Sequence, residues 1–142
     1  MPQRILIMGL PGSGKTTLAV ALMNKLSARW FNADSVRKLR NDWDFSHEGR
    51  IRQATRMREL CDISSHAFTI ADFVAPLQEM RDIFDADITI WVDTITESRY
   101  ADTNQMFVAP TQYDFRVTEQ DAEKWSDVIL AYIILKGAIC SL

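Results

Sequence analysis

Residues 9–16 have the sequence GLPGSGKT, which matches the pattern G-x-x-x-x-G-K-[ST] and decides the fold. A short apolar run, RILIM at residues 4–8, precedes this stretch, and the segment after it has apolar residues at helical spacing, at Leu18, Leu22 and Leu26. Small residues let successive backbone N–H groups turn inward around a phosphate, and the following helix adds positive potential at its N-terminus. A buried strand, a glycine loop and a helix in this order predict a P-loop that holds the phosphates of a nucleoside triphosphate.

Two side chains of this loop are expected to act on the phosphates and on a metal. Lys15 is expected to reach the β- and γ-phosphates, and the hydroxyl of Thr16 to take one position on Mg²⁺. The predicted ATP-binding residues are Gly9, Leu10, Pro11, Gly12, Ser13, Gly14, Lys15, Thr16 and Thr17. Because kinases, GTPases and mechanical ATPases all use P-loops, the motif predicts binding and leaves the reaction open. A GTPase is disfavoured, since we find no N/T-K-x-D guanine motif and residues 24–27 (NKLS) lack its Asp.

Strands and helices alternate along the rest of the chain. Apolar and β-branched runs predict strands at residues 4–8, 28–32, 68–74, 87–92 and 115–117. Helical spacing predicts helices at residues 16–26, 47–65 and 76–84, with a last helix that ends near residue 135. The expected helix-start residues are Ser46 as an N-cap, Pro76 in a first turn, and Thr118 with Asp121 as a capping box before the last helix. We therefore predict an α/β, P-loop NTPase-type three-layer fold with a parallel sheet covered by helices on both faces.

The composition is that of an ordinary compact protein. The 142 residues are 47% hydrophobic and 25% charged, which suits one domain over residues 1–142, with the chain from residue 137 onward as a docked or frayed tail. A net charge of −3 disfavours a nucleic-acid partner. Cys61 and Cys140 form no metal-ligand pattern and suit a reduced compartment. Since we find no signal peptide and no apolar stretch of about 20 residues, we expect a cytoplasmic protein without a membrane partner.

An acceptor site is expected beside the phosphates, because ligands of open α/β sheets bind beyond the carboxyl ends of the strands. Asp34 follows the second predicted strand, where it can orient an acceptor hydroxyl, accept its proton or hold Mg²⁺ through water. Arg37 shares its helical face and suits an acidic substrate; the alternative is that Asp34 caps a helix and Arg37 is solvated. Asp72 follows an apolar run as a Walker-B acid would, and is either a water-mediated Mg²⁺ ligand or a polar strand-end residue.

The run NADSVRKLRNDWDFSHEGRIRQATR, residues 32–56, resembles a segment of the adenylylsulfate kinase (APS kinase) family. That family has a GD-N-VR element followed by FS-x-E-x-R and a helix that contains an Asn. Together with GLPGSGKTT, the resemblance covers most of the first 60 residues. Members of the family transfer the γ-phosphate of ATP to the 3′-hydroxyl of adenylylsulfate, which makes 3′-phosphoadenylylsulfate (PAPS). The resemblance therefore implies a kinase that uses ATP with Mg²⁺ and an adenylylsulfate-like acceptor.

The resemblance also implies roles for individual residues of this run. Asp34 would act at the acceptor hydroxyl, while Arg37 and Arg50 would bind the phosphosulfate group of the acceptor. Phe45 would lie against the adenine of the acceptor, and Gln53 stands where the family has its Asn. The alternatives are a core aromatic for Phe45 and a surface charge for Arg50.

The later half of the chain departs from the family pattern in two places. Residues 75–77 (APL) replace the family's Ser-Pro-Tyr, which excludes a phosphorylated serine there and leaves direct transfer. The lid between residues 92 and 110 is shorter than in the family, with Arg99 as its basic residue. Arg99 is therefore our candidate for steadying the γ-phosphate in the transition state. Phe107, in a remnant of the lid motif (QMFVAP), either closes on the adenine opposite Phe45 or packs on the core.

The sequence thus predicts a small kinase with Lys15, Asp34 and Arg99 as catalytic residues. Its predicted acceptor-binding residues are Asp34, Arg37, Phe45, Arg50, Gln53 and Phe107, and its predicted Mg²⁺ residues are Thr16 and Asp72. Two alternatives stay open because the lid is short. One is a kinase for another small hydroxylated compound, such as a nucleotide, a nucleoside or a sugar acid. The other is a regulatory module that binds a nucleotide without transferring phosphate. Separately, the chain could form a homodimer.

Overall fold

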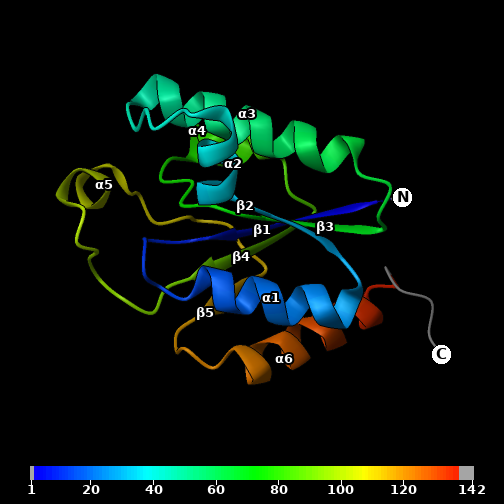
Figure 1. The fold of residues 1–142 in the computed structure, drawn as a ribbon. Coiled ribbons are helices and arrows are strands. Elements are labelled where there is room, and N and C mark those ends of the chain that lie inside the picture. Colours follow the sequence, from blue (N-terminus) through cyan, green and yellow to red (C-terminus); the bar gives the residue numbers. More distant parts are fainter. Residues whose placement is uncertain (1, 138–142) are drawn as a thin grey trace.

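The computed structural model describes residues 2–137 and contains five strands and six helices within that range (Figure 1). The strands are β1 (Gln3–Met8), β2 (Arg29–Asn32), β3 (Phe68–Asp72), β4 (Ile88–Val92) and β5 (Phe115–Val117). The helices are α1 (Lys15–Leu26), α2 (Ala33–Arg40), α3 (His47–Ile63), α4 (Gln78–Phe84), α5 (Ala101–Met106) and α6 (Ala122–Leu135). Cys140 and the expected tail beyond residue 137 lie outside the described residues.

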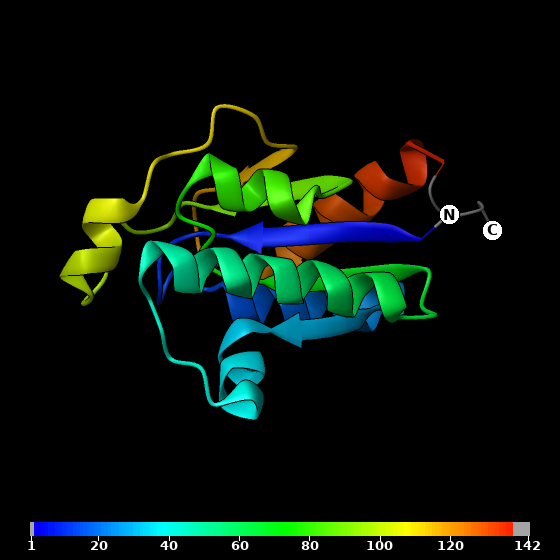
Figure 2. The ribbon, with the colours of Figure 1, turned by 90° about the horizontal axis from the view of Figure 1, so that it is seen from above.

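All five strands run parallel in one sheet, in the order β2-β3-β1-β4-β5. Helices α1 and α6 cover one face of the sheet, and α2, α3 and α4 cover the other (Figure 1). The short helix α5 stands apart, beyond the end of the sheet (Figure 2). The predicted three-layer α/β fold with a parallel sheet is therefore confirmed.

The central strand β1 packs into two separate hydrophobic cores. Ile5 and Ile7 face the core under α1 and α6, whereas Leu6 and Met8 face the core under α3 and α4. Successive side chains of a strand point to opposite faces, and all four are 0% exposed. Full burial of a side chain of this size stabilises the fold by about 1.5–3 kcal/mol. The end of β1, where the glycine loop begins, is therefore firmly anchored.

The start of α4 differs from the sequence prediction. The helix begins at Gln78 with Leu77 as its N-cap, so Pro76 precedes the helix and does not lie in its first turn. The chain turns sharply before it, because Ala75 has a φ of 47°. The carbonyl groups of Ala75 and Pro76 then accept hydrogen bonds from the side chain of Arg81, which holds this segment outside the helix.

The predicted N-cap of α3 is confirmed, whereas only part of the predicted cap of α6 is. Ser46 is the N-cap of α3, as predicted, and its hydroxyl accepts from the Gly49 N–H. The N-cap of α6 is Asp121, whose carboxylate accepts from the Lys124 N–H, so the predicted capping role of Thr118 is wrong. An Asp one residue before the helix reaches the free N–H groups directly and makes an earlier cap unnecessary.

The end of β3 and the presence of α5 also differ from the sequence prediction. The predicted strand at residues 68–74 ends at Asp72, since β3 has no partner residue beyond that position. The helix α5 was not predicted and lies within the shortened lid that we expected between residues 92 and 110. Between residues 2 and 137, no helix is long and apolar enough to cross a membrane.

Candidate active site

The glycine loop joins β1 to α1 and requires glycine at two positions, at Gly9 for both space and backbone conformation and at Gly14 for backbone conformation. Gly9 has a φ of 151°, and a Cβ there would lie 2.4 Å from the carbonyl oxygen of Val92. Gly14 is the N-cap of α1 with a φ of 104°, and a Cβ there would lie 3.4 Å from Gln120 Cγ. Because such φ values disfavour any side chain, the loop can close tightly over the end of the sheet only with these glycines.

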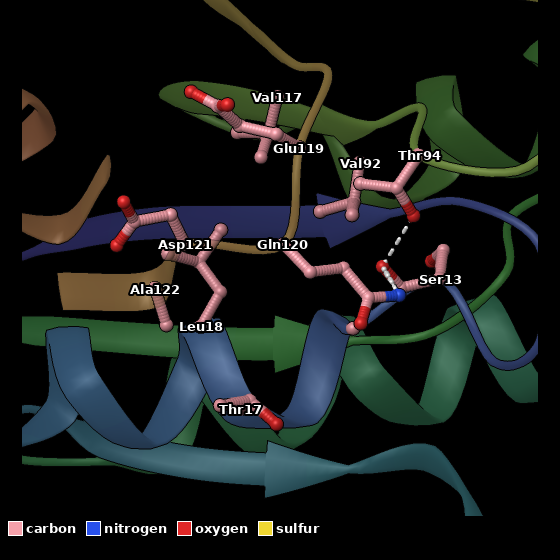
Figure 3. Close-up of a pocket in the computed structure, with 11 residues that line it drawn as sticks. Ser13, Thr17, Leu18, Val92, Thr94, Val117, Glu119, Gln120, Asp121 and Ala122 are labelled. Carbon is pink, nitrogen blue, oxygen red and sulfur yellow. Dashed lines mark hydrogen bonds between the residues drawn. The ribbon is translucent and has the colours of Figure 1, made fainter. Parts of the chain in front are cut away.

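Two residues from distant segments hold the loop from outside. Thr94 Oγ1 donates to the Ser13 carbonyl at 2.6 Å, and Gln120 Nε2 donates to the same oxygen at 3.1 Å (Figure 3). A fixed carbonyl also fixes its planar peptide unit, and hence the direction of the next N–H group. The sequence analysis missed both residues, because the contacts span 81 and 107 positions and no local pattern marks them.

A cavity of about 140 Å³ lies beside the loop, between the start of α1 and residues 119–122 (Figure 3). Its walls combine aliphatic side chains with polar groups such as those of Thr17 and Glu119. A mixed lining of this kind is typical of small-molecule sites. Since Ser13 and Gly14 also line it, a group bound in the cavity would be continuous with phosphates on the loop.

Lys15 is enclosed by the loop that it follows. The side chain is 9% exposed, and its Nζ donates to the Leu10 carbonyl at 3.0 Å. Burial lowers the pKa of Lys15, while the negative charges of Asp72 and Asp34 oppose that shift. An ammonium group with little hydration interacts strongly with phosphate oxygens, and the contact of Lys15 with the Leu10 carbonyl places this charge beside the glycine loop.

Asp72 ends β3 beside the loop and is 2% exposed. Its Oδ2 atom accepts three hydrogen bonds, from Thr16 Oγ1 at 3.2 Å, Trp30 Nε1 at 3.1 Å and Asn32 Nδ2 at 3.1 Å. The strand order explains the meeting, because β3 lies between β1 and β2. Trp30 and Asn32 were not among the predicted site residues, since only the strand order brings them to Asp72.

The two predicted Mg²⁺ residues are therefore neighbours. A hydroxyl and a carboxylate supply the oxygen ligands that Mg²⁺ prefers, so Thr16 and Asp72 fit this metal. In the described part of the chain, no group of three or more His, Cys, Asp and Glu side chains could hold a metal ion. Mg²⁺ that arrives with a nucleotide needs no such group, because one or two protein ligands and the phosphates are enough.

Asp34 lies exposed in the first turn of α2. The N-cap of this helix is Asn32, whose side chain accepts from the Ser35 N–H at 3.1 Å, so the alternative that Asp34 caps the helix is wrong. A carboxylate in the first turn is stabilised by the helix dipole. Asp34 follows the end of β2, where Asn32 bonds to the same Asp72 oxygen as Thr16, so Asp34 lies at the same edge of the sheet as the glycine loop.

Arg37 is buried, at 3% exposure, so the alternative of a solvated Arg37 is wrong. Its Nη1 donates to the carbonyl groups of Asp42 and Asp44 at 3.1 and 3.0 Å. Burial lowers the pKa of this guanidinium. The group lies 4.3 Å from the ring centroid of Phe45, and it therefore also shapes the loop that carries this ring.

Phe45 and Arg50 complete a wall that we call the acceptor wall, made of Arg37, Phe45 and Arg50. Phe45 is 42% exposed and is not a core aromatic, while Arg50 is 6% exposed and is not a surface charge. Arg50 lies 5.3 Å from the Phe45 ring centroid and donates to the Phe45 carbonyl at 2.9 Å. It also donates to Thr103 Oγ1 at 2.8 Å, which ties α3 to α5. The wall is an open aromatic ring flanked by two buried cations.

Gln53 lies behind this wall and is 2% exposed. Its Nε2 donates to the Ala33 carbonyl at 3.1 Å, which joins α3 to the start of α2. Its Oε1 is buried and accepts no hydrogen bond within the described residues. Since an unpaired buried acceptor costs free energy, Gln53 retains the capacity to accept one more hydrogen bond.

Two predicted site residues do not join the others. Phe107 is half-buried and packs on the core under α3 and α4, with the Arg81 guanidinium 5.5 Å from its ring centroid. This placement matches the alternative in which Phe107 packs on the core. Arg99 is exposed and donates to the Tyr100 hydroxyl at 3.0 Å. Within the described residues it makes no hydrogen bond to residues 9–17.

Arg81 is a structural residue that the sequence analysis missed. It is 7% exposed, and its guanidinium donates to the carbonyl groups of Ala75 at 2.8 Å, Pro76 at 3.1 Å and Val108. The Val108 N–H donates in turn to the Pro76 carbonyl at 2.8 Å. Burial lowers the pKa of Arg81 to about 10. The chain after α5 is therefore fastened to the segment between β3 and α4.

A parallel sheet with a P-loop after β1 and a charged aromatic wall at the same edge define a P-loop kinase. A profile of the family described as Adenylylsulphate kinase matches residues 1–109, so the chain belongs to that family. A Pseudomonas aeruginosa protein named "Probable adenylyl-sulfate kinase" is 32% identical over 98 residues. The match covers 63% of this chain and 46% of that protein, so the chain spans less than half the length of this curated relative.

Solved structures show the same fold at low sequence identity. The Mycobacterium tuberculosis APS kinase in complex with AMPPNP and APS has a TM-score of 0.75 and 18% identity, over 94% of this chain and 99% of that one. The shikimate kinase of Acinetobacter baumannii in complex with shikimate has a TM-score of 0.65 and 17% identity, over 96% of this chain and 95% of that one. The fold is therefore shared by kinases that act on different small molecules.

Proposed function

We propose that this chain is an ATP-dependent phosphotransferase of the adenylylsulfate kinase type, which phosphorylates the 3′-hydroxyl of adenylylsulfate. The observation that carries the proposal is the acceptor wall, in which the exposed Phe45 ring lies beside the buried guanidinium groups of Arg37 and Arg50. An aromatic face suits a nucleotide base, and guanidinium groups suit phosphate and sulfate oxygens. Adenylylsulfate carries both of these features.

The nucleotide side would work by charge neutralisation. When bound with ATP, Mg²⁺ supplies positive charge to the β- and γ-phosphates. Thr16 would hold the ion through its hydroxyl, and Asp72 through a metal-bound water. Lys15 would bind the same phosphates with an ammonium group that is already poorly hydrated, as its lowered pKa indicates. These charges stabilise the transferring phosphoryl group.

On the acceptor side, Asp34 would orient the 3′-hydroxyl and take its proton as the oxygen bonds to the γ-phosphorus. The bond between that phosphorus and the β–γ bridging oxygen breaks at the same time, which leaves ADP. Ala75 has no hydroxyl, so transfer is direct. Arg99 would reach the γ-phosphate from its exposed position and stabilise the transition state.

The direct test is to incubate the protein with ATP, Mg²⁺ and adenylylsulfate and to measure ADP and PAPS together, with Lys15→Ala as the blank. Phe45→Ala should raise the KM for adenylylsulfate by about tenfold or more, since stacking on an aromatic ring contributes about 1–3 kcal/mol per base. The KM for ATP should stay unchanged. Leu39→Ala is the matched control, because Leu39 is an apolar residue of α2 that is 83% exposed. An equal rise in both KM values would contradict the assignment of the acceptor wall.

A second candidate is a kinase for another small hydroxylated acceptor. This candidate is favoured because Arg37 and Arg50 already donate hydrogen bonds within the protein, to carbonyl groups and to Thr103. Fewer N–H groups then remain for a phosphosulfate group. Release of ADP with nucleosides, nucleotides or sugar acids, but not with adenylylsulfate, would favour this candidate. Nucleotide binding without turnover on any acceptor would instead favour the regulatory module. That the chain forms a homodimer stays a separate prediction.

A further inference from the structure

Asp72 is held by two neutral donors from the neighbouring strand. Trp30 Nε1 and Asn32 Nδ2 each lie 3.1 Å from Asp72 Oδ2. The two residues are two positions apart in β2, so their side chains point to the same face of the sheet. Thr16 Oγ1 donates to the same oxygen at 3.2 Å. One carboxylate oxygen therefore collects donors from β2 and from the first turn of α1.

These contacts separate the Asp72 oxygen that accepts hydrogen bonds from the oxygen atoms left for Mg²⁺ and its bound water. Oδ2 of Asp72 is occupied by three donors, while its Oδ1 accepts no hydrogen bond from residues 2–137. Oδ1 is thus the oxygen left for a metal-bound water. The Thr16 hydroxyl gives its proton to Oδ2 and accepts from Asn32 Nδ2 at 3.4 Å, which leaves its second lone pair for Mg²⁺. The orientation of Asp72 therefore sets both predicted Mg²⁺ contacts.

The neutrality of the two donors matters for a dication. An indole N–H and a carboxamide hold the carboxylate without adding charge. An Arg or Lys at either position would hold it too but would cancel the negative charge that attracts Mg²⁺. Both donors are also fixed, since Trp30 packs on the core under α1 and the Asn32 side chain accepts from the Ser35 N–H. The carboxylate is both held and left negative.

We propose that Trp30 and Asn32 are positioning residues for Mg²⁺, which act by holding the Asp72 carboxylate beside Thr16. The inference rests on the proposed function in one respect, that Mg²⁺ and a nucleotide bind at residues 9–17. It needs no acceptor and no turnover. Its measure is the ratio of nucleotide dissociation constants without and with Mg²⁺.

The test is calorimetric titration of AMPPNP into the protein, once with EDTA and once with saturating Mg²⁺. Trp30→Phe keeps an aromatic ring and removes the N–H. This change should reduce the Mg²⁺-dependent gain in affinity by about tenfold, because a hydrogen bond to a charged group is lost. The Kd in EDTA should stay unchanged. Trp125→Phe is the matched control, since the Trp125 Nε1 is buried and has no partner in the described residues.

A second variant tests the same inference in case Trp30→Phe does not fold. Asn32→Ser removes the carboxamide but keeps a residue that caps α2 well, so the helix should be retained. It should show the same reduced gain with Mg²⁺ and the same unchanged Kd in EDTA. An unchanged Mg²⁺ gain in both folded variants would overturn the inference, as would an equal loss of affinity with and without Mg²⁺.

The wild-type protein separates this inference from the proposed function. A wild-type affinity for AMPPNP that does not respond to Mg²⁺ would overturn the inference and the magnesium part of the proposed function together. A wild-type response to Mg²⁺ that both variants retain in full would overturn the inference alone. Product formation from adenylylsulfate is measured separately, so its failure cannot be mistaken for either result.

Discussion

The nucleotide side and the lid segment of this molecule are built in different ways. The nucleotide side, residues 9–17, continues directly from β1 into α1 and is also held from three other strand ends. Thr16 bonds to Asp72 at the end of β3, and the Ser13 carbonyl accepts from Thr94 after β4 and from Gln120 after β5. These three contacts fix two atoms of the loop, Thr16 Oγ1 and the Ser13 carbonyl oxygen. The shape of the glycine loop is therefore set by the surrounding strand ends.

The lid segment, residues 99–108 within the predicted lid between residues 92 and 110, is attached beside α3 and α4 and not at the strand ends that hold the glycine loop. Helix α5 stands beyond the end of the sheet (Figure 2) and is tied to α3 by the hydrogen bond from Arg50 to Thr103. The chain after it is fastened by Arg81 and by the Val108 N–H. The glycine loop is thus held from the ends of four strands, whereas the lid segment is held by two buried arginines, the Val108 N–H and the packing of Phe107. Changes on each side should therefore have separable effects.

The largest effect is expected on the nucleotide side, from Lys15→Ala. Loss of the buried ammonium should lower the rate of phosphate transfer by about 10³-fold, which is typical for removal of one preorganised charge or donor. Steady-state measurement of ADP release would give the rate. Lys38→Ala, which removes an exposed lysine of α2, should leave the rate unchanged. A similar rate for Lys15→Ala and Lys38→Ala would contradict the assigned role.

On the lid side, Arg81→Ala should have the largest effect. Three carbonyl groups would lose their donor, and the free energy of unfolding should fall by about 3 kcal/mol. Hydrogen exchange of the Val108 amide should accelerate more than exchange in β1. Arg58→Ala is the control, because its ion pair with Asp62 is partly exposed, at 32% and 46% of the two side chains, and should contribute about 1 kcal/mol or less. Uniform acceleration across the sheet would mean that Arg81 supports the whole fold.

A smaller effect is expected from steric crowding at the loop. Gly9→Ala would place a Cβ 2.4 Å from the Val92 carbonyl, whereas a Cβ at Gly12 meets nothing within 4 Å. Both positions have positive φ, so the pair separates the clash from backbone strain. The free energy of unfolding, measured in urea, should fall by about 2 kcal/mol more for Gly9→Ala than for Gly12→Ala, in line with the cost of overpacking. Equal losses would show that backbone strain alone explains the need for glycine.

The same contrast explains what the sequence could predict. The P-loop, the Ser46 cap and all five strands come from local patterns that the structure confirms. The meeting of Trp30 and Asn32 at Asp72 depends on β3 lying between β1 and β2, and spacing alone does not reveal strand order. Helix α5 is only six residues long and has no capping side chain, so it lacks the signals that mark a helix.

The smallest effect concerns the loop that carries the acceptor wall. The carboxylate of Asp42 accepts from Arg52 at 2.9 Å and from the Asp44 N–H at 3.1 Å, and Arg56 lies 2.7 Å away. These groups, Arg52 foremost, hold the pKa of Asp42 well below its usual range. A carboxyl with a depressed pKa in the folded state contributes stability above its unfolded pKa of about 4, and that stability is lost as the pH falls further.

Asp42→Asn should therefore lower the Tm at neutral pH by a small amount, since partly exposed ion pairs contribute little. The difference from wild type should shrink below about pH 4 and vanish once Asp42 is protonated in both states. Thermal unfolding over a series of pH values would follow it. A difference that does not shrink as the pH falls from about 4 toward the depressed pKa of folded Asp42 would show that the shape of this loop, and not its charge, supports the backbone carbonyls that hold Arg37. In that case the acceptor wall would depend on the packing of this loop and not on its charge, and salt should leave the Tm difference between wild type and Asp42→Asn unchanged.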